Sequence, residues 1–493
     1  MHYSTSKNHS RFGYYCVIIF LGLKIVHAQD STAKHSIKGE VKANAFISSA
    51  QTPFWLKANQ MSVVPTRSAA SLEGYIGYET ILSKKTTHWK VFGEARIVGN
   101  LGNSTKLFIP VVNAGIHFKK LALYVGRKQE QFGLSDTTLG TGSYSWSGNA
   151  LPMPKIQLET IGYIPLKFTK NLFALKGNYA HGWFGSSQYA YNYYLHQKSL
   201  YIRIGRENWA VKLYGGFNHQ VQWGGKTNID IATVVNRKLP SSFGDYVYAV
   251  TGWGALIGDV KGVNAFDSLN RVGNHLGTID IGITFDLKKY ELSLYRQNIY
   301  EDGSLYYLTN IADGLNGLVF RNLFPSKEKG KVNFERLVFE FLYTLSQGDA
   351  AGVSTVTIGN DNYFNHQQYY DGWSYKGTII GTPFFTNAKD TKNTDPQNGY
   401  EIANNNRVRV YHLGLQGNIG ENIQFLSKLS LSHNYGTYNF PYAQVPKQFS
   451  ALLQFTGTIK RWQGIYWNAA FAIDNGQLYH NSIGTRIGIS KRW

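Results

Sequence analysis

The chain has 493 residues and a formal net charge of +20, with 43% hydrophobic and 15% aromatic residues. Its 51 Gly and 34 Tyr argue against a mainly helical protein, because Gly is a poor and Tyr a modest helix former. The single cysteine, Cys16, excludes a disulfide framework and a thiolate metal site.

The first predicted element is a secretory signal peptide over residues 1–28. Lys7 and Arg11 precede the apolar run Phe12–Leu23, and Ala28 ends a small-x-small cleavage site. The mature chain, 29–493, would then contain no cysteine. It also has no later apolar run of about 18 residues, so it cannot cross a membrane with helices. For an exported chain that spans a membrane, this leaves a closed β-barrel.

Alternating apolar and small or polar residues predict membrane-facing strands in several later segments. The clearest are 281–285, 337–343, 453–459 and 465–473. In 337–343, for example, Leu337 and Phe339 alternate with Val338 and Glu340. A soluble β-sandwich would give the same alternation, so periodicity alone leaves both folds open.

The end of the chain favours the barrel. Thr485, Ile487 and Ile489 alternate toward a final Trp493. A last strand that ends on an aromatic residue is the signal that outer-membrane barrels present to their assembly machinery. We therefore expect an all-β fold, a transmembrane antiparallel β-barrel that occupies 29–493 as a single domain in the outer membrane of a Gram-negative cell.

The connections between these strands fall into two kinds. Four short turns are basic: Lys84-Lys85, Lys119-Lys120, Lys288-Lys289 and Lys460-Arg461. Long polar connections are expected over 132–158, 222–245, 300–320 and 360–406. Barrels carry short turns on the periplasmic side and long loops outside, so much of the positive charge is expected near lipid headgroups, not at a nucleic-acid site.

Sequence motifs of enzymes and metal sites are incomplete. Gly225-Lys226-Thr227 lacks the first glycine of a phosphate-binding loop, there is no H-E-x-x-H, and the 14 His are scattered without ligand spacing. Acidic residues in the long connections, such as Glu301 and Asp313, are compatible with a glycosidase. A glycosidase needs two carboxylates at a defined distance from each other, and the sequence does not show that distance. We expect no cofactor, no metal and no enzymatic activity.

The segment Asp361–Trp373 mixes aromatic rings with amide and carboxylate groups. Sugars are bound in this way, with ring faces stacked on aromatic side chains and hydroxyl groups hydrogen-bonded to polar ones. An aromatic girdle with a hydrogen-bonded loop core would have the same composition, and the chemistry alone favours that second interpretation.

The chain resembles the capsule assembly Wzi family. The resemblance lies in stretches that run in order through most of 50–415: 53–60, 147–156, 195–200, His219 with 223–225, 270–277, 300–304, 313–315, 361–373 and 405–408. It implies an 18-stranded barrel with a plugged lumen and a lectin-like role toward exported capsular polysaccharide.

The leading hypothesis is a non-enzymatic outer-membrane protein that binds or tethers capsular or another surface polysaccharide, with membrane lipid and the assembly machinery as further partners. The alternative is a channel for oligosaccharides or other nutrients, and a glycan lyase or hydrolase comes third. The expected aromatic platforms are Trp373, Tyr363, Tyr370 and Trp223. The expected polar partners of the sugar are Asp361, Asn362, His366 and Arg271.

Overall fold

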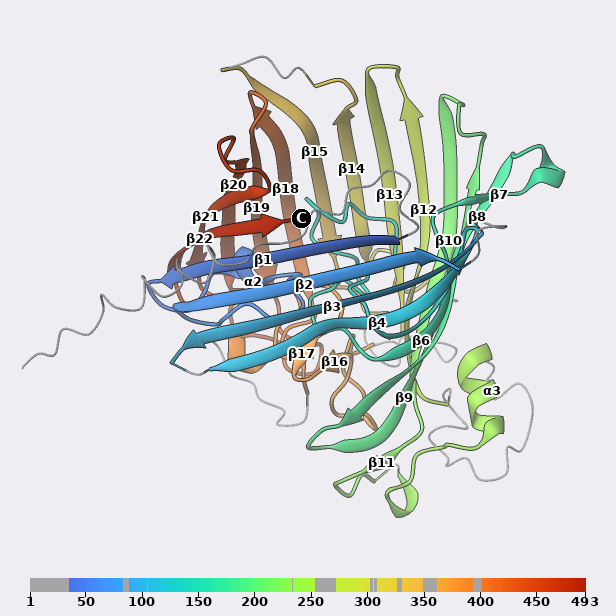
Figure 1. Cartoon of the computed structure of the whole chain (residues 1–493). Helices are drawn as coiled ribbons and strands as arrows, with labels where there is room; N and C mark the ends of the chain where they lie inside the picture. The colour runs from blue at the N-terminus through green and yellow to red at the C-terminus, as the bar shows by residue number, and fades with distance from the viewer. Residues whose placement is uncertain are drawn as a thin grey trace, which may run out of the picture.

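The computed structural model describes residues 35–82, 88–103, 105–232, 234–252, 272–301, 305, 308–325, 330–348, 361–392 and 401–493. In this part of the chain, eighteen long antiparallel strands form one sheet that closes on itself where β22 pairs with β1. Figure 1 shows the resulting barrel, with the first and last strands side by side. The predicted barrel is confirmed.

The wall strands are β1 (His35–Ser48), β2 (Ala69–Ile81), β3 (Trp89–Gly102), β4 (Lys106–Phe118), β5 (Leu121–Arg127), β6 (Lys155–Thr160), β8 (Phe173–Ser186), β9 (Ala190–Ile204), β10 (Val211–Trp223), β12 (Asn274–Asp286), β13 (Tyr290–Tyr300), β14 (Gly314–Asn322), β15 (Val332–Tyr343), β18 (Val408–Ile419), β19 (Ile423–Asn434), β20 (Lys447–Thr458), β21 (Ile465–Gly476) and β22 (Ser482–Arg492). The short strands β7 (Ile164–Pro165) and β11 (Lys226–Thr227) pair with β8 and β9 at their ends.

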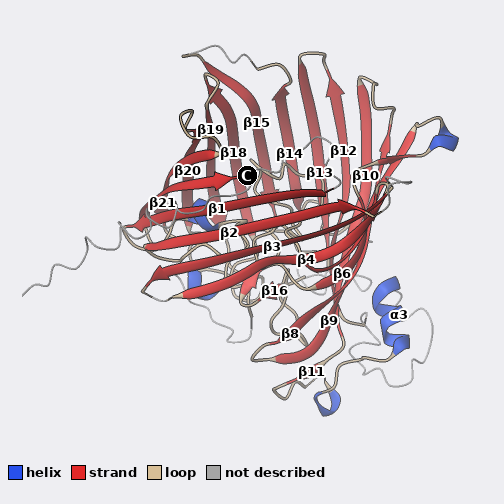
Figure 2. Ribbon diagram, in the orientation of Figure 1, coloured by secondary structure: helices blue, strands red, loops and turns tan. Residues whose placement is uncertain are grey.

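The remaining described elements are short and lie off this wall (Figure 2). They are the helices α2 (Phe54–Lys57) and α3 (Phe243–Thr251), the 3₁₀ turns η1 (Lys167–Thr169), η2 (Val235–Arg237) and η3 (Ala388–Asp390), and a hairpin of β16 (Ser374–Tyr375) and β17 (Thr378–Ile379). Among the described residues, no helix has the length and apolar content needed to cross a bilayer.

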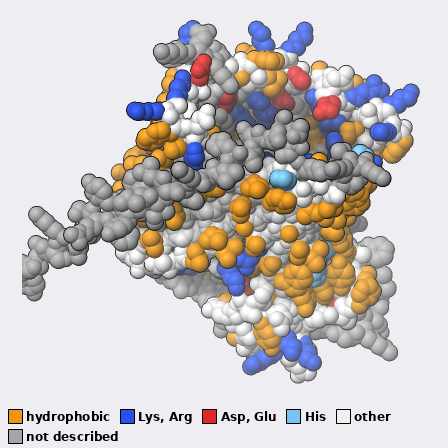
Figure 3. All heavy atoms as spheres, in the orientation of Figure 1, with side chains coloured by type: hydrophobic (Ala, Val, Ile, Leu, Met, Phe, Trp, Pro, Cys, Tyr) orange, Lys and Arg blue, Asp and Glu red, His pale blue; other side chains and the backbone are white. Residues whose placement is uncertain are grey.

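The wall has an apolar outer face and a polar inner face, as the alternation predicted. Ile281 is 57% exposed, whereas its neighbour Asp280 is fully buried, and Phe339 is 44% exposed beside the fully buried Glu340. Hydrophobic side chains cover much of the strand wall in Figure 3, and Lys and Arg gather toward the two ends. An apolar outer surface of this extent is stable against lipid and not against water.

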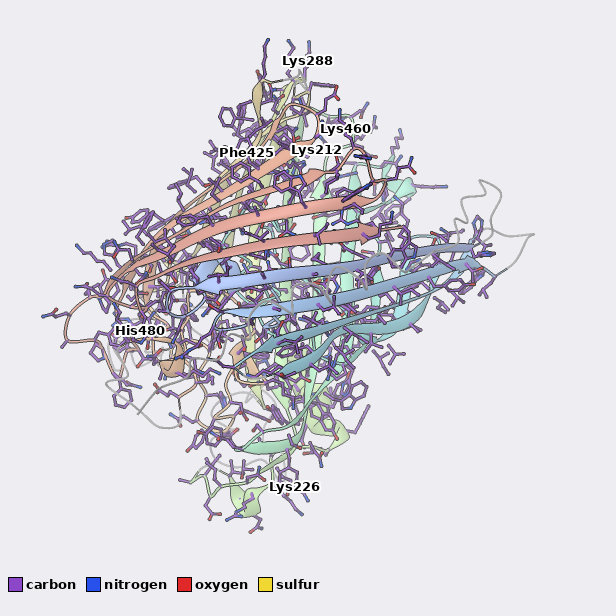
Figure 4. The ribbon with its side chains drawn as sticks, turned by 60° about the vertical axis from the view of Figure 1, so that its left-hand side comes forward. Lys212, Lys226, Lys288, Phe425, Lys460 and His480 are labelled. Atoms are coloured by element: carbon purple, nitrogen blue, oxygen red, sulfur yellow. The ribbon has the colours of Figure 1, made fainter. Side chains whose placement is uncertain are left out.

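The two ends of the barrel differ in their connections. Lys119-Lys120, Lys288-Lys289 and Lys460-Arg461 each join two adjacent strands at one end, here called the short-turn end. The fourth predicted basic turn, at Lys84-Lys85, lies outside the described residues, as does the predicted signal peptide. Figure 4 shows Lys288 and Lys460 at the short-turn end and Lys226 and His480 toward the other, the long-connection end.

Three connections from the long-connection end fold back into the barrel and fill its lumen. They are 49–68 with α2, 128–154, and the described parts of 344–407 with the β16–β17 hairpin. Their side chains form one buried cluster with inward residues of the wall, and Phe54, Tyr144 and Phe385 belong to it. The plugged lumen that the family resemblance implied is confirmed.

The structure corrects two of the predicted loops. Lys155–Thr160 within 132–158 is strand β6, and Gly314–Asn322 within 300–320 is strand β14. The remainder of 132–158 does not lie outside the barrel, because the backbone N–H of Tyr144 donates to Gln297 of β13 and Ser145 Oγ donates to Asn218 of β10. Inward polar side chains of the wall replace water as hydrogen-bond partners of this segment.

Candidate functional site

The predicted aromatic platforms Trp373 and Tyr363 lie in the buried core of the plug. Both side chains are fully buried, and the indole of Trp373 donates to Asn274 Oδ1 at 3.2 Å. The hydroxyl of Tyr363 donates to Asp313 Oδ2 at 2.8 Å and accepts from Asn310. In this conformation neither ring has a face available to a ligand, because plug segments and wall strands cover both of them.

The predicted polar residues of the same segment hold the plug together. Asn362 donates to Glu401 Oε1 at 2.7 Å and accepts from Asn406 Nδ2 at 2.7 Å. His366 Nδ1 accepts from the backbone N–H of Gln368 at 3.1 Å, and burial lowers the pKa of His366 to about 4. Asp361 is buried, and its backbone N–H donates to Gln347.

One predicted aromatic residue lies away from the plug. Trp223 ends strand β10 on the outer face of the wall, where its ring lies 5.1 Å from the ring of Tyr246 on α3. It is buried under that helix in a cluster separate from the lumen core. Arg271 lies outside the described residues.

Tyr370 lies at an open cavity of about 620 Å³ at the long-connection end. Four tyrosines line it, Tyr370 with Tyr189, Tyr193 and Tyr375, and we call it the tyrosine cleft. The rings of Tyr189 and Tyr370 are half-buried and meet edge to face at 5.8 Å between centroids. Together the two rings give the cleft an aromatic surface.

One side of the tyrosine cleft comes from the β8–β9 hairpin. Phe184 stacks on Tyr193 across the two strands with 4.7 Å between ring centroids. Aromatic pairs of this kind stabilise a hairpin and fix the orientation of both rings. The hairpin therefore presents its tyrosines from a rigid support.

The other side comes from the plug, and a carboxyl group joins the two sides. Asp371 accepts hydrogen bonds from Ser187 Oγ and, at 3.5 Å, from the hydroxyl of Tyr193. Burial raises the pKa of Asp371, while these two hydrogen bonds act to lower it. Asn387, Glu401 and Asn404 add further amide and carboxylate groups to the lining.

The arrangement is suited to a ligand with apolar ring faces and many hydroxyl groups. Tyrosine rings supply flat apolar contact, and the amides and carboxylates supply hydrogen-bond partners of both kinds. Within the described residues no group of three or more His, Cys, Asp or Glu could hold a metal ion.

Sequence reasoning found only part of this cleft. It selected Tyr370, which lines the cleft, and Asn362, which the structure places beside the cleft through its hydrogen bond to Glu401. It missed the hairpin, although Tyr189, Tyr191, Tyr193 and Tyr194 within six residues were a visible signal. The sequence of Asp361–Trp373 does not show which of its aromatic rings are buried. Only the packing of the plug decides which rings are buried and which are partly exposed.

Comparison with known proteins adds family evidence. A family model described as "Capsule assembly protein Wzi" matches residues 111–395, more than half of the chain. A search of curated proteins finds no match.

One solved structure adds evidence on the fold. The chain is similar to the Escherichia coli Wzi structure, described as an outer-membrane protein involved in group 1 capsule assembly and a carbohydrate-binding β-barrel. The identity is 14%, the TM-score 0.57, and the match covers 91% of this chain and 83% of that one. Acinetobacter baumannii OccAB2 is similar at 10% identity and a TM-score of 0.49, over 93% of this chain and 98% of that one.

Proposed function

The chain belongs to the capsule assembly protein Wzi family, and from this premise we propose that it binds exported capsular polysaccharide at the surface of a Gram-negative cell. Its fold is an outer-membrane β-barrel with an apolar wall. The proposed activity is binding without catalysis. Another exported surface glycan is the alternative ligand.

The observation that carries the proposal is the position of the tyrosine cleft. It opens at the long-connection end of the barrel, which faces the cell exterior in outer-membrane proteins. A polymer leaving the cell meets this end and not the periplasmic one. The half-buried rings of Tyr189 and Tyr370 would stack on a sugar, with Glu401 and Asn404 bound to its hydroxyl groups.

Tethering follows from the repetition of the ligand. A polysaccharide repeats the same unit many times, so one chain can occupy the clefts of several barrels in the same membrane. Weak single contacts then hold the polymer through a high effective concentration. This is how we propose that the protein organises polysaccharide at the surface.

The plug argues against the alternative of a nutrient channel. Buried side chains of three segments fill the lumen, including Trp55, Tyr144 and Phe364, so no continuous aqueous path is expected without a rearrangement of the plug. We also propose that the exposed wall residues contact membrane lipid and that Trp493, paired with Gly39 at the short-turn end, engages the barrel assembly machinery.

The test is binding of extracted surface polysaccharide to the purified barrel in detergent. Tyr189→Ala with Tyr370→Ala should weaken binding about thirtyfold, because each of the two lost stacking contacts contributes about 1 kcal/mol. The matched control is Phe168→Ala with Trp462→Ala, two exposed aromatics at the short-turn end, 85% and 54% exposed. The site assignment fails if the cleft variant binds as the control does, and the function fails if the wild-type protein does not bind.

A further inference from the structure

A second cavity also borders the β16–β17 hairpin, at the same end of the barrel. Its volume is about 410 Å³, and we call it the basic cleft. Lys376, Asn387 and Lys389 line both this cavity and the tyrosine cleft. A single extended ligand can therefore cross the hairpin and occupy both.

The lining of the basic cleft is rich in positive charge. Five Lys or Arg side chains and one histidine face two carboxyl groups, Asp390 and Asp474. The six basic residues are Lys57, Arg67, Lys106, Lys376, Lys389 and His480. Asp474 is already engaged, because it accepts from the backbone N–H of Phe54 at 2.7 Å and from Ser450 Oγ at 2.6 Å.

The cations of the basic cleft lack close acidic partners. Among the described residues, Lys57, Arg67 and Lys106 have no carboxylate oxygen within 4.0 Å, and Lys389 donates instead to the carbonyl of Gly377. Burial lowers the pKa of Lys57, since its ammonium group has lost part of its hydration, while the carboxyl groups of Asp390 and Asp474 act to raise it. An anionic ligand would give a direct ion-pair partner to a cation that the protein has partly desolvated.

Two buried polar atoms of the lining also lack a partner in the described structure. Thr52 is 1% exposed and Asn100 4% exposed, and neither Thr52 Oγ1 nor Asn100 Oδ1 makes a hydrogen bond. The Asn100 amide nitrogen donates to the carbonyl of Val63, which fixes its oxygen as an open acceptor. Buried polar groups normally have partners, and a ligand hydroxyl group would supply one to each of these two atoms.

We propose that the basic cleft binds the carboxylate of an acidic sugar unit, so that the polysaccharide held by this protein is an acidic one. The inference rests on the proposed function and adds the chemical class of the ligand. One unit stacks in the tyrosine cleft, and the next acidic unit reaches across the β16–β17 hairpin into the basic cleft. Its carboxylate meets the Lys and Arg side chains there, and its hydroxyls meet Thr52 and Asn100.

The decisive experiment compares two forms of one polymer. Polysaccharide extracted from the surface of cells that make this protein is tested as isolated and after chemical reduction of its carboxyl groups to alcohols. The native form should bind about tenfold or more tightly than the reduced form, and the difference should shrink as salt rises from 50 to about 300 mM. Equal binding of both forms overturns the acidic specificity and leaves the proposed function intact. Binding of neither form overturns the proposed function itself.

A variant locates the effect in the basic cleft. Arg67→Gln with Lys106→Gln removes two exposed cations that contribute nothing to the core, so the barrel should fold normally. Affinity for the native polymer should fall about fivefold to tenfold, and affinity for the reduced polymer should stay unchanged. Lys288→Gln with Lys289→Gln makes the same charge change at the short-turn end and should bind as wild type. An equal loss in both variants would mean a general charge effect and would overturn the assignment to this cleft.

Discussion

Single aromatic residues of Asp361–Trp373 have two different roles, and burial decides which. Trp373 and Tyr363 are fully buried and hydrogen-bonded to Asn274 and Asp313, so they stabilise the plug. Tyr370, three residues from Trp373, is half-buried and lines the tyrosine cleft. The proposed sugar contact therefore rests on the least buried of these three rings.

Trp373→Ala should destabilise the protein by about 3–5 kcal/mol, because it leaves a large cavity and an unpartnered Asn274 oxygen in the core. Tyr370→Ala, which removes a half-buried ring, should cost about 2 kcal/mol or less. The measurement is chemical unfolding of the detergent-solubilised barrel. Equal stability of the two variants would contradict the assignment of Trp373 to the core.

His366 should make stability depend on pH below neutrality. Its folded pKa of about 4 lies below the ordinary 6.5, so the unfolded chain takes up a proton first as the pH falls. Above pH 6.5 His366 is neutral in both states and does not change the free energy of unfolding. Between pH 6.5 and about 4 the free energy of unfolding should fall, by at most about 3 kcal/mol.

The control is His366→Asn, which keeps an acceptor for the backbone N–H groups of Gln368 and Tyr369 but cannot take up a proton. The difference in unfolding free energy between wild type and variant should change across this pH window. A constant difference would show that His366 is protonated at the same pH in both states.

Among the elements, the three plug segments depend on close contacts with one another. Gly381 lies where 344–407 crosses 128–154, and the backbone N–H of Thr382 next to it donates to the carbonyl of Tyr144. A Cβ at Gly381 would lie 2.0 Å from that same carbonyl oxygen and 2.5 Å from the ring of Phe364. Backbone atoms cannot move aside as a flexible side chain can, so this crossing requires glycine.

Gly381→Val should force these two plug segments apart and open a path through the lumen. In planar lipid bilayers the wild-type protein should show no steady open conductance, whereas the variant should show pore openings. Gly74→Val is the control, because a Cβ at Gly74 meets nothing within 4 Å. A closed Gly381→Val barrel, or an open wild-type barrel, would contradict this account of the plug.

The molecule as a whole has two chemically distinct ends. Short basic turns occupy one end, where Lys288 and Lys460 lie in Figure 4. Both clefts lie at the other end, from which the plug segments enter the lumen. The proposed function requires the clefts to face the cell exterior, because the polymer accumulates there. The two ends can be distinguished by labelling, since the chain contains a single cysteine.

In a Cys16→Ala background, Lys226→Cys should react with a membrane-impermeant maleimide on intact cells. Lys288→Cys should react only after the outer membrane is permeabilised, because its turn faces the periplasm. Lys226 and Lys288 are both exposed on the protein, so a difference in labelling reports which side of the outer membrane each position faces. Labelling of Lys288→Cys on intact cells would reverse the orientation and remove the basis for glycan binding at the two clefts.

The amino-acid order alone determined the wall of this protein. Alternation with a period of two places Ile281 and Phe339 on the outer face and Asp280 and Glu340 on the inner face. This placement does not depend on the rest of the chain, because the outer face contacts lipid and the inner face contacts the polar lumen. The last strand and the basic turns could also be predicted from the sequence.

No such period governs the connections between the strands. Lys155–Thr160 was predicted as loop and is a strand, and Trp373 was predicted as a ligand platform and lies in the core. Those positions depend on which segments enter the lumen and what they meet there, as when Phe54 donates its N–H to Asp474, 420 residues away. Contacts between such distant residues leave no local pattern, and the two clefts are formed by them.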